Sequence, residues 1–261
     1  MPLFPMSSLA VSPKIISLFN QAGGVAKTTL AMNLGYQLAQ RDHRVLLIDL
    51  DPQASLTVFM GLKPFGLEAT IADSVLRSLP LPIHPNIYGM DLVPANIALS
   101  AAEIQLTSTL AREWKLKQAL ESVQESYEFI LIDSPPSLGI LSILGLVAST
   151  HILVPLETQF KAFMGVELLL DTVNQVRQQV NKELEIAGFV PTIFASANAQ
   201  DKQILEAVQQ QLSTVGTVFS PIPRATAFAD ASMARQPLAV YAPKHPAIAV
   251  LNEIAQALEE M

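Results

Sequence analysis

Short apolar runs alternate with stretches of helical period along most of this chain, and this alternation limits the folds open to it. The runs are bounded by charged or turn residues, as strands buried on both faces of a parallel sheet usually are. They cover residues 14–19, 44–50, 129–133, 151–155, 186–194 and 217–219. Helical segments cover residues 28–40, 100–123, 165–180, 201–212 and 247–259. We therefore predict an α/β protein with a doubly wound, mostly parallel sheet and helices on both faces.

The composition fits one large core. Half of the 261 residues are apolar and 15% are charged, so we expect one domain over residues 14–261 after a short N-terminal extension over residues 1–13. The first basic residue is Lys14, so the charged region of a secretory signal is missing. Apolar runs fall short of the ~20 residues that span a bilayer. The chain is expected to be cytoplasmic and to act without a membrane.

The absence of cysteine excludes several kinds of site, and the net charge bears on nucleic-acid binding. The sequence holds no cysteine, which excludes disulfides, thiolate nucleophiles and cysteine-held zinc or iron–sulfur sites within it. The four histidines are dispersed and lack metal-ligand spacing. A net charge of −7 does not indicate a nucleic-acid protein by itself. Association follows the local field, however, so a basic patch stays compatible with this charge.

A glycine-rich segment joins the first expected strand to the first expected helix. Backbone N–H groups of two adjacent glycines can surround phosphate oxygens, and the helix N-terminus adds partial positive charge. Lys27 would reach the β- and γ-phosphates, and the Thr28 hydroxyl would bind Mg²⁺. The strict P-loop pattern fails because Gln21 and Ala26 occupy its glycine positions, and a Gly-Gly turn before an ordinary helix is the alternative. The predicted nucleotide-binding residues are Gly23, Gly24, Val25, Ala26, Lys27, Thr28 and Thr29.

Carboxylates end two further expected strands. Asp49 and Asp51 fall on the same side of the second strand by period-two alternation, and Asp133 ends an apolar strand in a Walker B arrangement. Such carboxylates suit a Mg²⁺–water network and an attacking water. Any one of them could instead cap a helix or begin a turn. Three at strand ends, together with the glycine-rich loop, favour a nucleotide site.

Four segments of the chain resemble segments of one known family. The ParA/MinD family of deviant-Walker ATPases, in its small ParA type, has similar segments in the same order and at similar spacing. They are GGVAKTT (23–29), LLIDLDPQ (46–53), FILIDSPPSLG (129–139) and SPIPRATAFADA (220–231). The resemblance implies an ATP-dependent sandwich dimer, slow hydrolysis that a partner stimulates, and the positioning of a cargo.

The resemblance also implies roles for individual residues. Asp51 corresponds to the residue that orients or activates the attacking water, and Asp49 and Asp133 correspond to residues of the Mg²⁺ shell. Asn198 and Pro223 lie in stretches that resemble the adenine-contacting loops. The cofactors implied are therefore ATP and Mg²⁺, and the choice of adenine rests on the resemblance alone.

One departure concerns the signature lysine, which the family normally carries directly before Gly-Gly. That position is Ala22 here. Loss of a charged hydrogen bond to triphosphate costs ~1.5–3 kcal/mol, so either the dimer is weaker or another cation substitutes. We expect the substitute, and a third catalytic residue beside Asp51 and Lys27, to be Lys161; the alternative is a solvated loop lysine. A missing signature lysine resembles the McdA-like branch that positions carboxysomes, although plasmid-type relatives could share it.

The second departure concerns DNA. In the segment 220–231 an arginine often present in the family is replaced by Ala227. Arg224, Arg235 and Lys202 remain as predicted DNA contacts, with Lys244 as a further member of a basic patch. Each could equally be a solvated surface charge. Non-specific DNA binding needs only ~10⁻⁴–10⁻⁶ M affinity, and a dimer gains avidity, so we expect DNA binding and a nucleoid-associated location.

Other branches of the family fit less well. The iron-protein reductases need cysteines. The MinD branch ends in a basic amphipathic membrane helix, whereas Glu253, Glu259 and Glu260 lie in the last helix here. Thirteen residues before the first strand are too few for an added DNA-binding domain. We therefore expect a cargo-positioning ATPase with a ParB- or McdB-like adaptor. The alternatives are a nucleotide-binding switch module with little hydrolysis and a metabolic ATP-dependent P-loop enzyme.

Overall fold

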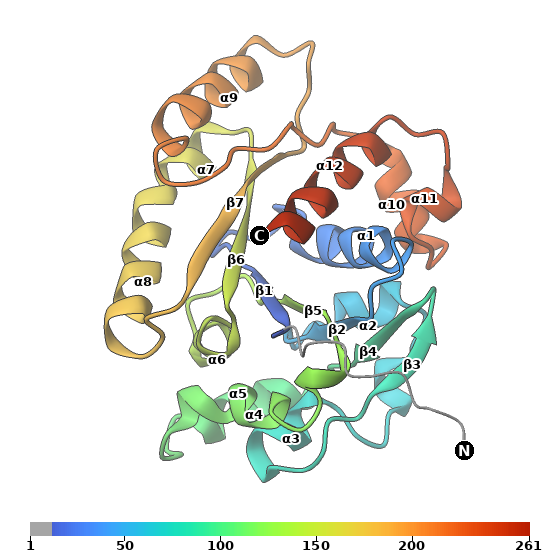
Figure 1. The fold of residues 1–261 in the computed structure, drawn as a ribbon, viewed down its shortest axis with the longest axis vertical. Helices are drawn as coiled ribbons and strands as arrows, with labels where there is room; N and C mark the ends of the chain where they lie inside the picture. Colours follow the sequence, from blue (N-terminus) through green and yellow to red (C-terminus); the bar gives the residue numbers. More distant parts are fainter. Residues whose placement is uncertain (1–11) are drawn as a thin grey trace, which may run out of the picture.

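The computed structural model describes residues 12–261, apart from the side chains of Ala162 and Phe163. Residues 1–11 of the predicted extension lie outside the described residues. One sheet of seven strands runs through the described part in the order β3-β4-β2-β5-β1-β6-β7 (Figure 1). The strands are β1 (Lys14–Leu18), β2 (Val45–Asp49), β3 (His84–Ile87), β4 (Met90–Val93), β5 (Phe129–Asp133), β6 (His151–Glu157) and β7 (Glu185–Thr192).

Helices cover both faces of this sheet, as predicted from the sequence. They are α1 (Lys27–Ala39), α2 (Ser55–Phe59), α3 (Ile71–Arg77), α4 (Ala98–Leu106), α5 (Lys115–Leu120), α6 (Ile140–Ala148), α7 (Phe160–Met164), α8 (Val166–Gln179), α9 (Ala199–Leu212), α10 (Thr226–Met233), α11 (Leu238–Tyr241) and α12 (Ala247–Glu260). Figure 1 shows α1 and α10 to α12 together on one side of the sheet, away from α3 to α6.

Alternate strand residues feed two separate cores. On β5, Phe129 and Leu131 join the cluster formed with α1, α2 and α10 to α12. Ile130 and Ile132 join the opposite cluster with α3 to α6. A third cluster packs β6 and β7 against α8 and α9. Burial on both faces explains why the strands are continuous apolar runs.

Register brings two predicted carboxylates together at the carboxyl edge of the sheet. Strand β5 pairs in parallel with both β1 and β2, and in the second ladder Asp49 is the direct partner of Asp133. The expected mostly parallel sheet is therefore confirmed. The exception is β3, which pairs antiparallel with β4. The two central residues of this hairpin, Tyr88 and Gly89, both have positive φ, which is the backbone of a type I′ turn.

Two predicted elements are wrong. The helix expected over 100–123 is broken between α4 and α5. At the break, the hydroxyls of Thr107, Ser108 and Thr109 donate to backbone carbonyls and so compete with the helical hydrogen bonds. Residues 217–219 form a single bridge, Phe189 to Val218, instead of a strand. Prolines 221 and 223 follow and have no N–H to continue a ladder.

Among residues 12–261, no helix combines the length and the hydropathy needed to cross a bilayer.

Candidate nucleotide-binding site

The glycine-rich loop follows β1 at the carboxyl edge of the sheet. Gly24 and Ala26 both have left-handed backbone, with φ of 77° and 71°. No atom lies within 4 Å of the point where a Cβ on Gly24 would stand, so this side of the loop is open. The Asn20 side chain secures the loop: its Oδ1 accepts from Ala22 N at 2.9 Å, and its Nδ2 donates to Pro155 O at 2.7 Å. Asn20 thus ties the start of the loop to the end of β6.

Lys27 begins α1 with its amine folded into the loop. The Nζ atom donates to the carbonyl oxygens of Asn20 and Ala22, each at 2.8 Å. The residue is only 7% exposed. Burial lowers the pKa of its amine, and the nearby carboxylates of Asp133 and Asp51 oppose that shift. A cation is therefore held at the loop, with two bonds that it can exchange for phosphate oxygens.

Asp133 at the end of β5 is a buried carboxyl without a hydrogen-bond partner. Both oxygens are unpaired among the described residues, and the residue is 1% exposed. Burial first, and the neighbouring Asp49 charge second, raise its pKa well above the usual range. The Thr28 hydroxyl lies close enough to lower that pKa, yet it makes no hydrogen bond with acceptable geometry to Asp133. An orphaned carboxylate beside a hydroxyl fits a hard cation such as Mg²⁺.

Asp49 is used differently from Asp133. Its Oδ2 accepts from Thr57 N at 2.8 Å and from Thr57 Oγ1 at 2.7 Å, and its Oδ1 accepts from Asp51 N at 3.2 Å. The Thr57 hydroxyl in turn accepts from Ala95 N at 2.9 Å. Asp49 therefore holds the turn that carries Asp51 against α2. Its membership in a Mg²⁺ shell stays a prediction.

The pH dependence of stability tests this burial of Asp49. Burial outweighs the three hydrogen bonds and raises the pKa of Asp49 to about 6, against about 3.9 in an unfolded chain. The resulting stability is present below the unfolded pKa and is lost as pH rises through the folded one. Urea unfolding without Mg²⁺ should show wild type losing on the order of 2 kcal/mol between about pH 4 and 6, relative to Asp49→Asn. Parallel curves for the two proteins would contradict this picture.

A cavity of about 280 Å³ brings the predicted phosphate site together. Seven predicted loop residues and Asp51 line it, with Ser55 and Phe59 of α2 and with Ser134 and Pro136 after β5. Asp51 lies beyond the end of β2, where its Oδ1 accepts from Gln53 N at 2.9 Å. Asp49 and Asp133 are buried and do not line the cavity. The Lys27 amine, the Thr28 hydroxyl and the Asp51 carboxylate thus surround a space that can hold phosphates.

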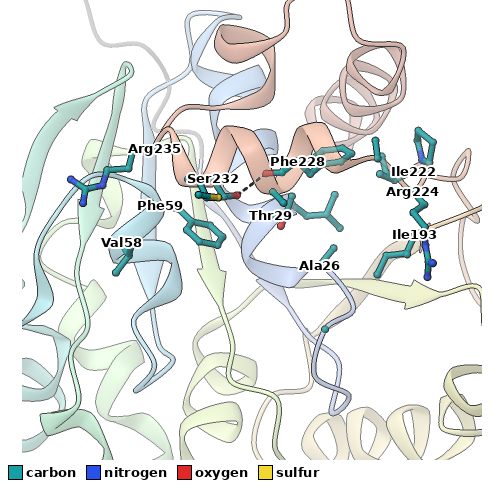
Figure 2. Close-up of a pocket in the computed structure, with 16 residues that line it drawn as sticks. Ala26, Thr29, Val58, Phe59, Ile193, Ile222, Arg224, Phe228, Ser232 and Arg235 are labelled. Atoms are coloured by element: carbon teal, nitrogen blue, oxygen red, sulfur yellow. Dashed lines mark hydrogen bonds between the residues drawn. The ribbon is translucent and has the colours of Figure 1, made fainter.

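An apolar cavity of about 670 Å³ adjoins the phosphate site (Figure 2). Both cavities share Gly24, Ala26, Thr29 and Phe59. Figure 2 shows Ala26 and Thr29 beneath α10, whose Ser232 Oγ donates to Phe228 O at 2.9 Å. Pro223 lines this cavity, and its contact with the base stays a prediction. Phe59 and Phe228 were not predicted; the aromatic residue inside the segment 220–231 was the available signal.

A third, polar cavity of about 560 Å³ holds Lys161 and Asn198. Lys161 is exposed on α7 and does not line the phosphate cavity. Asn198 caps α9, because its Oδ1 accepts from Gln200 N at 3.0 Å. Arg224 lines both this cavity and the apolar one, and its Nη2 lies 3.9 Å from Glu157 Oε1. The three cavities thus form one row along the carboxyl edge of the sheet.

The predicted DNA contacts are only partly brought together. Arg224 and Arg235 line the same apolar cavity, and in Figure 2 they stand at opposite ends of the residues drawn. Lys202 is exposed on α9 and lines none of the three cavities. Lys244 is exposed between α11 and α12. A basic patch that includes Lys202 therefore stays a prediction.

A glycine-rich loop between β1 and α1, with acidic residues at the ends of neighbouring parallel strands, defines a P-loop nucleotide-binding protein. Residues 13–186 match the family model described as an AAA domain. The chain is 35% identical over 246 residues to the sporulation initiation inhibitor protein Soj of Bacillus subtilis, covering 93% of this chain and 97% of that protein. It is 34% identical over 233 residues to the chromosome partitioning protein ParA of Caulobacter vibrioides, covering 87% of each. The chain belongs to the ParA/MinD family of P-loop ATPases.

Solved structures share this fold. A cobyrinic acid a,c-diamide synthase from Mycobacterium smegmatis, with bound ATP analog and magnesium, superposes with a TM-score of 0.84, 32% identity and 95% coverage of each chain. A McdA–ATP complex from Cyanothece gives a TM-score of 0.85 at 23% identity, covering 95% of this chain and 97% of that chain. At that identity the second likeness shows the fold alone.

Proposed function

We propose that this chain is an ATPase that dimerises when it binds ATP, binds DNA non-specifically, and positions a cargo with the help of an adaptor. The observation that carries the proposal is one cavity that joins Lys27, Thr28 and Asp51 and is also lined by Ser134, the residue after the orphaned carboxylate of Asp133. Residues 14–261 would act as one ATPase domain. The resemblance to Soj and ParA over most of their length supports the partitioning role.

The residues of the cavity suit hydrolysis of ATP to ADP and phosphate. Backbone N–H groups of the loop would bind the phosphates, and the Lys27 amine would leave the carbonyls of Asn20 and Ala22 for phosphate oxygens. Asp133 and Thr28 would hold Mg²⁺, which neutralises charge on the β- and γ-phosphates. Asp51 would orient the attacking water and accept its proton. The apolar cavity beside Thr29 and Pro223 offers space for the adenine.

Lys161 is the proposed replacement for the signature lysine. Ala22 carries no charge at the position of the signature lysine, whereas Lys161 is exposed at the same carboxyl edge of the sheet. Lys161 does not line the phosphate cavity of its own chain, and in this proposal it contacts the nucleotide of a second copy. Such a division of the site between two chains makes hydrolysis depend on the dimer. The proposal also includes slow hydrolysis that a ParB- or McdB-like adaptor stimulates.

The proposal also includes binding to DNA of the nucleoid in the cytoplasm. Arg224 and Arg235 are the cations near the nucleotide cavities that could contact phosphates of DNA. We expect the ATP-bound protein to retain duplex DNA of any sequence, with affinity falling steeply as salt rises. Arg235→Ala should weaken this binding about threefold or more and reduce the slope of log affinity against log salt by about 1 per subunit. Lys182→Ala, on the loop before β7, is the control. Equal DNA binding with ADP and with ATP would contradict the proposed switch.

A second candidate rests on one observation, the 32% identity to the cobyrinic acid a,c-diamide synthase structure. An ATP-dependent amide synthase would hydrolyse ATP only when a carboxylic substrate and ammonia are present. Purified protein should therefore be incubated with ATP, Mg²⁺ and ammonium, with and without cobyrinic acid. Amide formation would favour this candidate. Phosphate release that ignores cobyrinic acid would favour the partitioning ATPase.

A further inference from the structure

Asp201 is a buried carboxylate that the phosphate site does not use. It lies in the first turn of α9 and is 8% exposed. Its Oδ2 accepts from Ala195 N at 2.8 Å and from Thr158 Oγ1 at 3.1 Å. These donors come from two different loops, one after β6 and one after β7. A single oxygen atom thus joins two strand ends of the carboxyl edge.

Helix capping does not explain this carboxylate. The cap of α9 is already supplied by Asn198, whose Oδ1 accepts from Gln200 N. Asp201 stands three residues later, where an acidic side chain would usually bond back to the cap residue's own N–H. Its oxygen instead bonds to Ala195 and Thr158, outside the helix. A carboxylate accepting two donors makes stronger bonds than a neutral acceptor would.

Further buried hydrogen bonds connect Asp201 to the phosphate loop. Thr158 N donates to Thr192 O at 3.2 Å, and Thr192 Oγ1 donates to Val25 O at 3.2 Å. Thr158 is 2% exposed and Thr192 is fully buried. The bonds therefore run without interruption from a phosphate-loop carbonyl, through the ends of β7 and β6, to Asp201.

The bonds to Asp201 stand next to two predicted site residues. Thr158 precedes Lys161 by three positions, and Ala195 precedes Asn198 by three positions. Lys161, Asn198 and Asp201 line the same polar cavity. We propose that Asp201 is a positioning residue, which holds the Lys161 helix and the Asn198 loop in a fixed relation to the phosphate loop. This inference rests on the proposed function, because Lys161 and Asn198 have their roles from it.

The proposal separates two effects that one experiment can measure. The experiment measures affinity for fluorescently labelled ADP and ATP, and the fraction of dimer formed with ATP. The proteins are full-length wild type, Asp201→Ala, Asp201→Asn and Thr158→Val. The control is Glu206→Gln, an exposed acid on the same helix. Asp201→Ala should lower the affinity for both nucleotides about tenfold, which is the effect of losing roughly one net hydrogen bond. Thr158→Val removes only the bond from Thr158 Oγ1 to Asp201 Oδ2, on the loop that leads to Lys161, so it should lower the dimer fraction while ADP affinity stays within about twofold.

Asp201→Asn keeps an acceptor oxygen and should restore most of the affinity, which a general loss of folding would not allow. Amide hydrogen exchange gives a readout without nucleotide. Residues 158–164 and 195–198 should exchange faster in Asp201→Ala than in wild type, and at the wild-type rate in Glu206→Gln. Wild-type affinities and wild-type exchange in folded Asp201→Ala would overturn the positioning role. Failure of wild type to bind ATP, with faster exchange still seen in Asp201→Ala, would instead overturn the proposed function alone.

Discussion

Alanine in place of Asp51 is expected to reduce steady-state ATP hydrolysis by about 10²–10⁴-fold, while ATP binding is kept. Asp51 lines the phosphate cavity and lies beyond the end of β2, on a turn that Asp49 holds through Asp51 N. Its side chain therefore borders the space that we propose for the phosphates. In the proposed function this carboxylate orients the water and accepts its proton, so the ATP-bound state should accumulate when it is removed. Phosphate release measured with saturating ATP and Mg²⁺ tests the expectation.

The control for this change is Asp42→Asn, because Asp42 is an exposed carboxylate whose left-handed backbone asparagine also tolerates. Its hydrolysis should equal that of wild type. Phosphate release that persists in Asp51→Ala would assign the water to another group. A wild type that binds ATP and releases no phosphate would favour the switch module with little hydrolysis.

Lys27→Ala should weaken ATP binding by roughly tenfold to more than a hundredfold, because it removes charged hydrogen bonds of ~1.5–3 kcal/mol each. The Lys27 amine is the cation that the structure holds inside the phosphate loop, bonded to Asn20 O and Ala22 O. Adenosine without phosphates should lose little affinity, since the apolar cavity is untouched. Titration calorimetry with ATP, ADP and adenosine measures this difference.

Lys182→Ala serves as the matched control for Lys27, since Lys182 is exposed and lies outside all three cavities of the site. Equal losses of adenosine and ATP affinity in Lys27→Ala would mean that the loop has collapsed. Unchanged ATP affinity would mean that the phosphates bind elsewhere.

Local signals explain which parts of the fold could be predicted. Buried parallel strands are apolar on both faces, so β1, β2 and β5 stand out in the sequence, and a strand–Gly–Gly–Lys–Thr–helix segment identifies the phosphate loop without any distant contact. The β3–β4 hairpin was missed because each strand has four residues and half of β3 is exposed. Its signal was a Tyr-Gly pair rather than the usual Asn-Gly.

Period-two reasoning was less reliable for the carboxylates. It placed Asp49 and Asp51 on the same side of one strand, but β2 ends at Asp49 and the chain turns over residues 51–54, where Ala54 N donates to Asp51 O. Asp49 consequently faces Thr57, eight positions away, and only Asp51 reaches the cavity. Contacts of this kind depend on how a loop returns to the strand. The bond between Thr158 and Asp201, 43 positions apart, has no sequence signal at all.

Sedimentation velocity of the purified protein tests the central proposal, the ATP-switched dimer, most directly. The protein is run in Mg²⁺ with no nucleotide, with ADP and with ATP, beside Lys161→Ala and Asp51→Ala. The proposal predicts a dimer with ATP only, a dimer that persists in Asp51→Ala, and a dimer lost or much weakened in Lys161→Ala. An oligomeric state that is the same with and without ATP would contradict it.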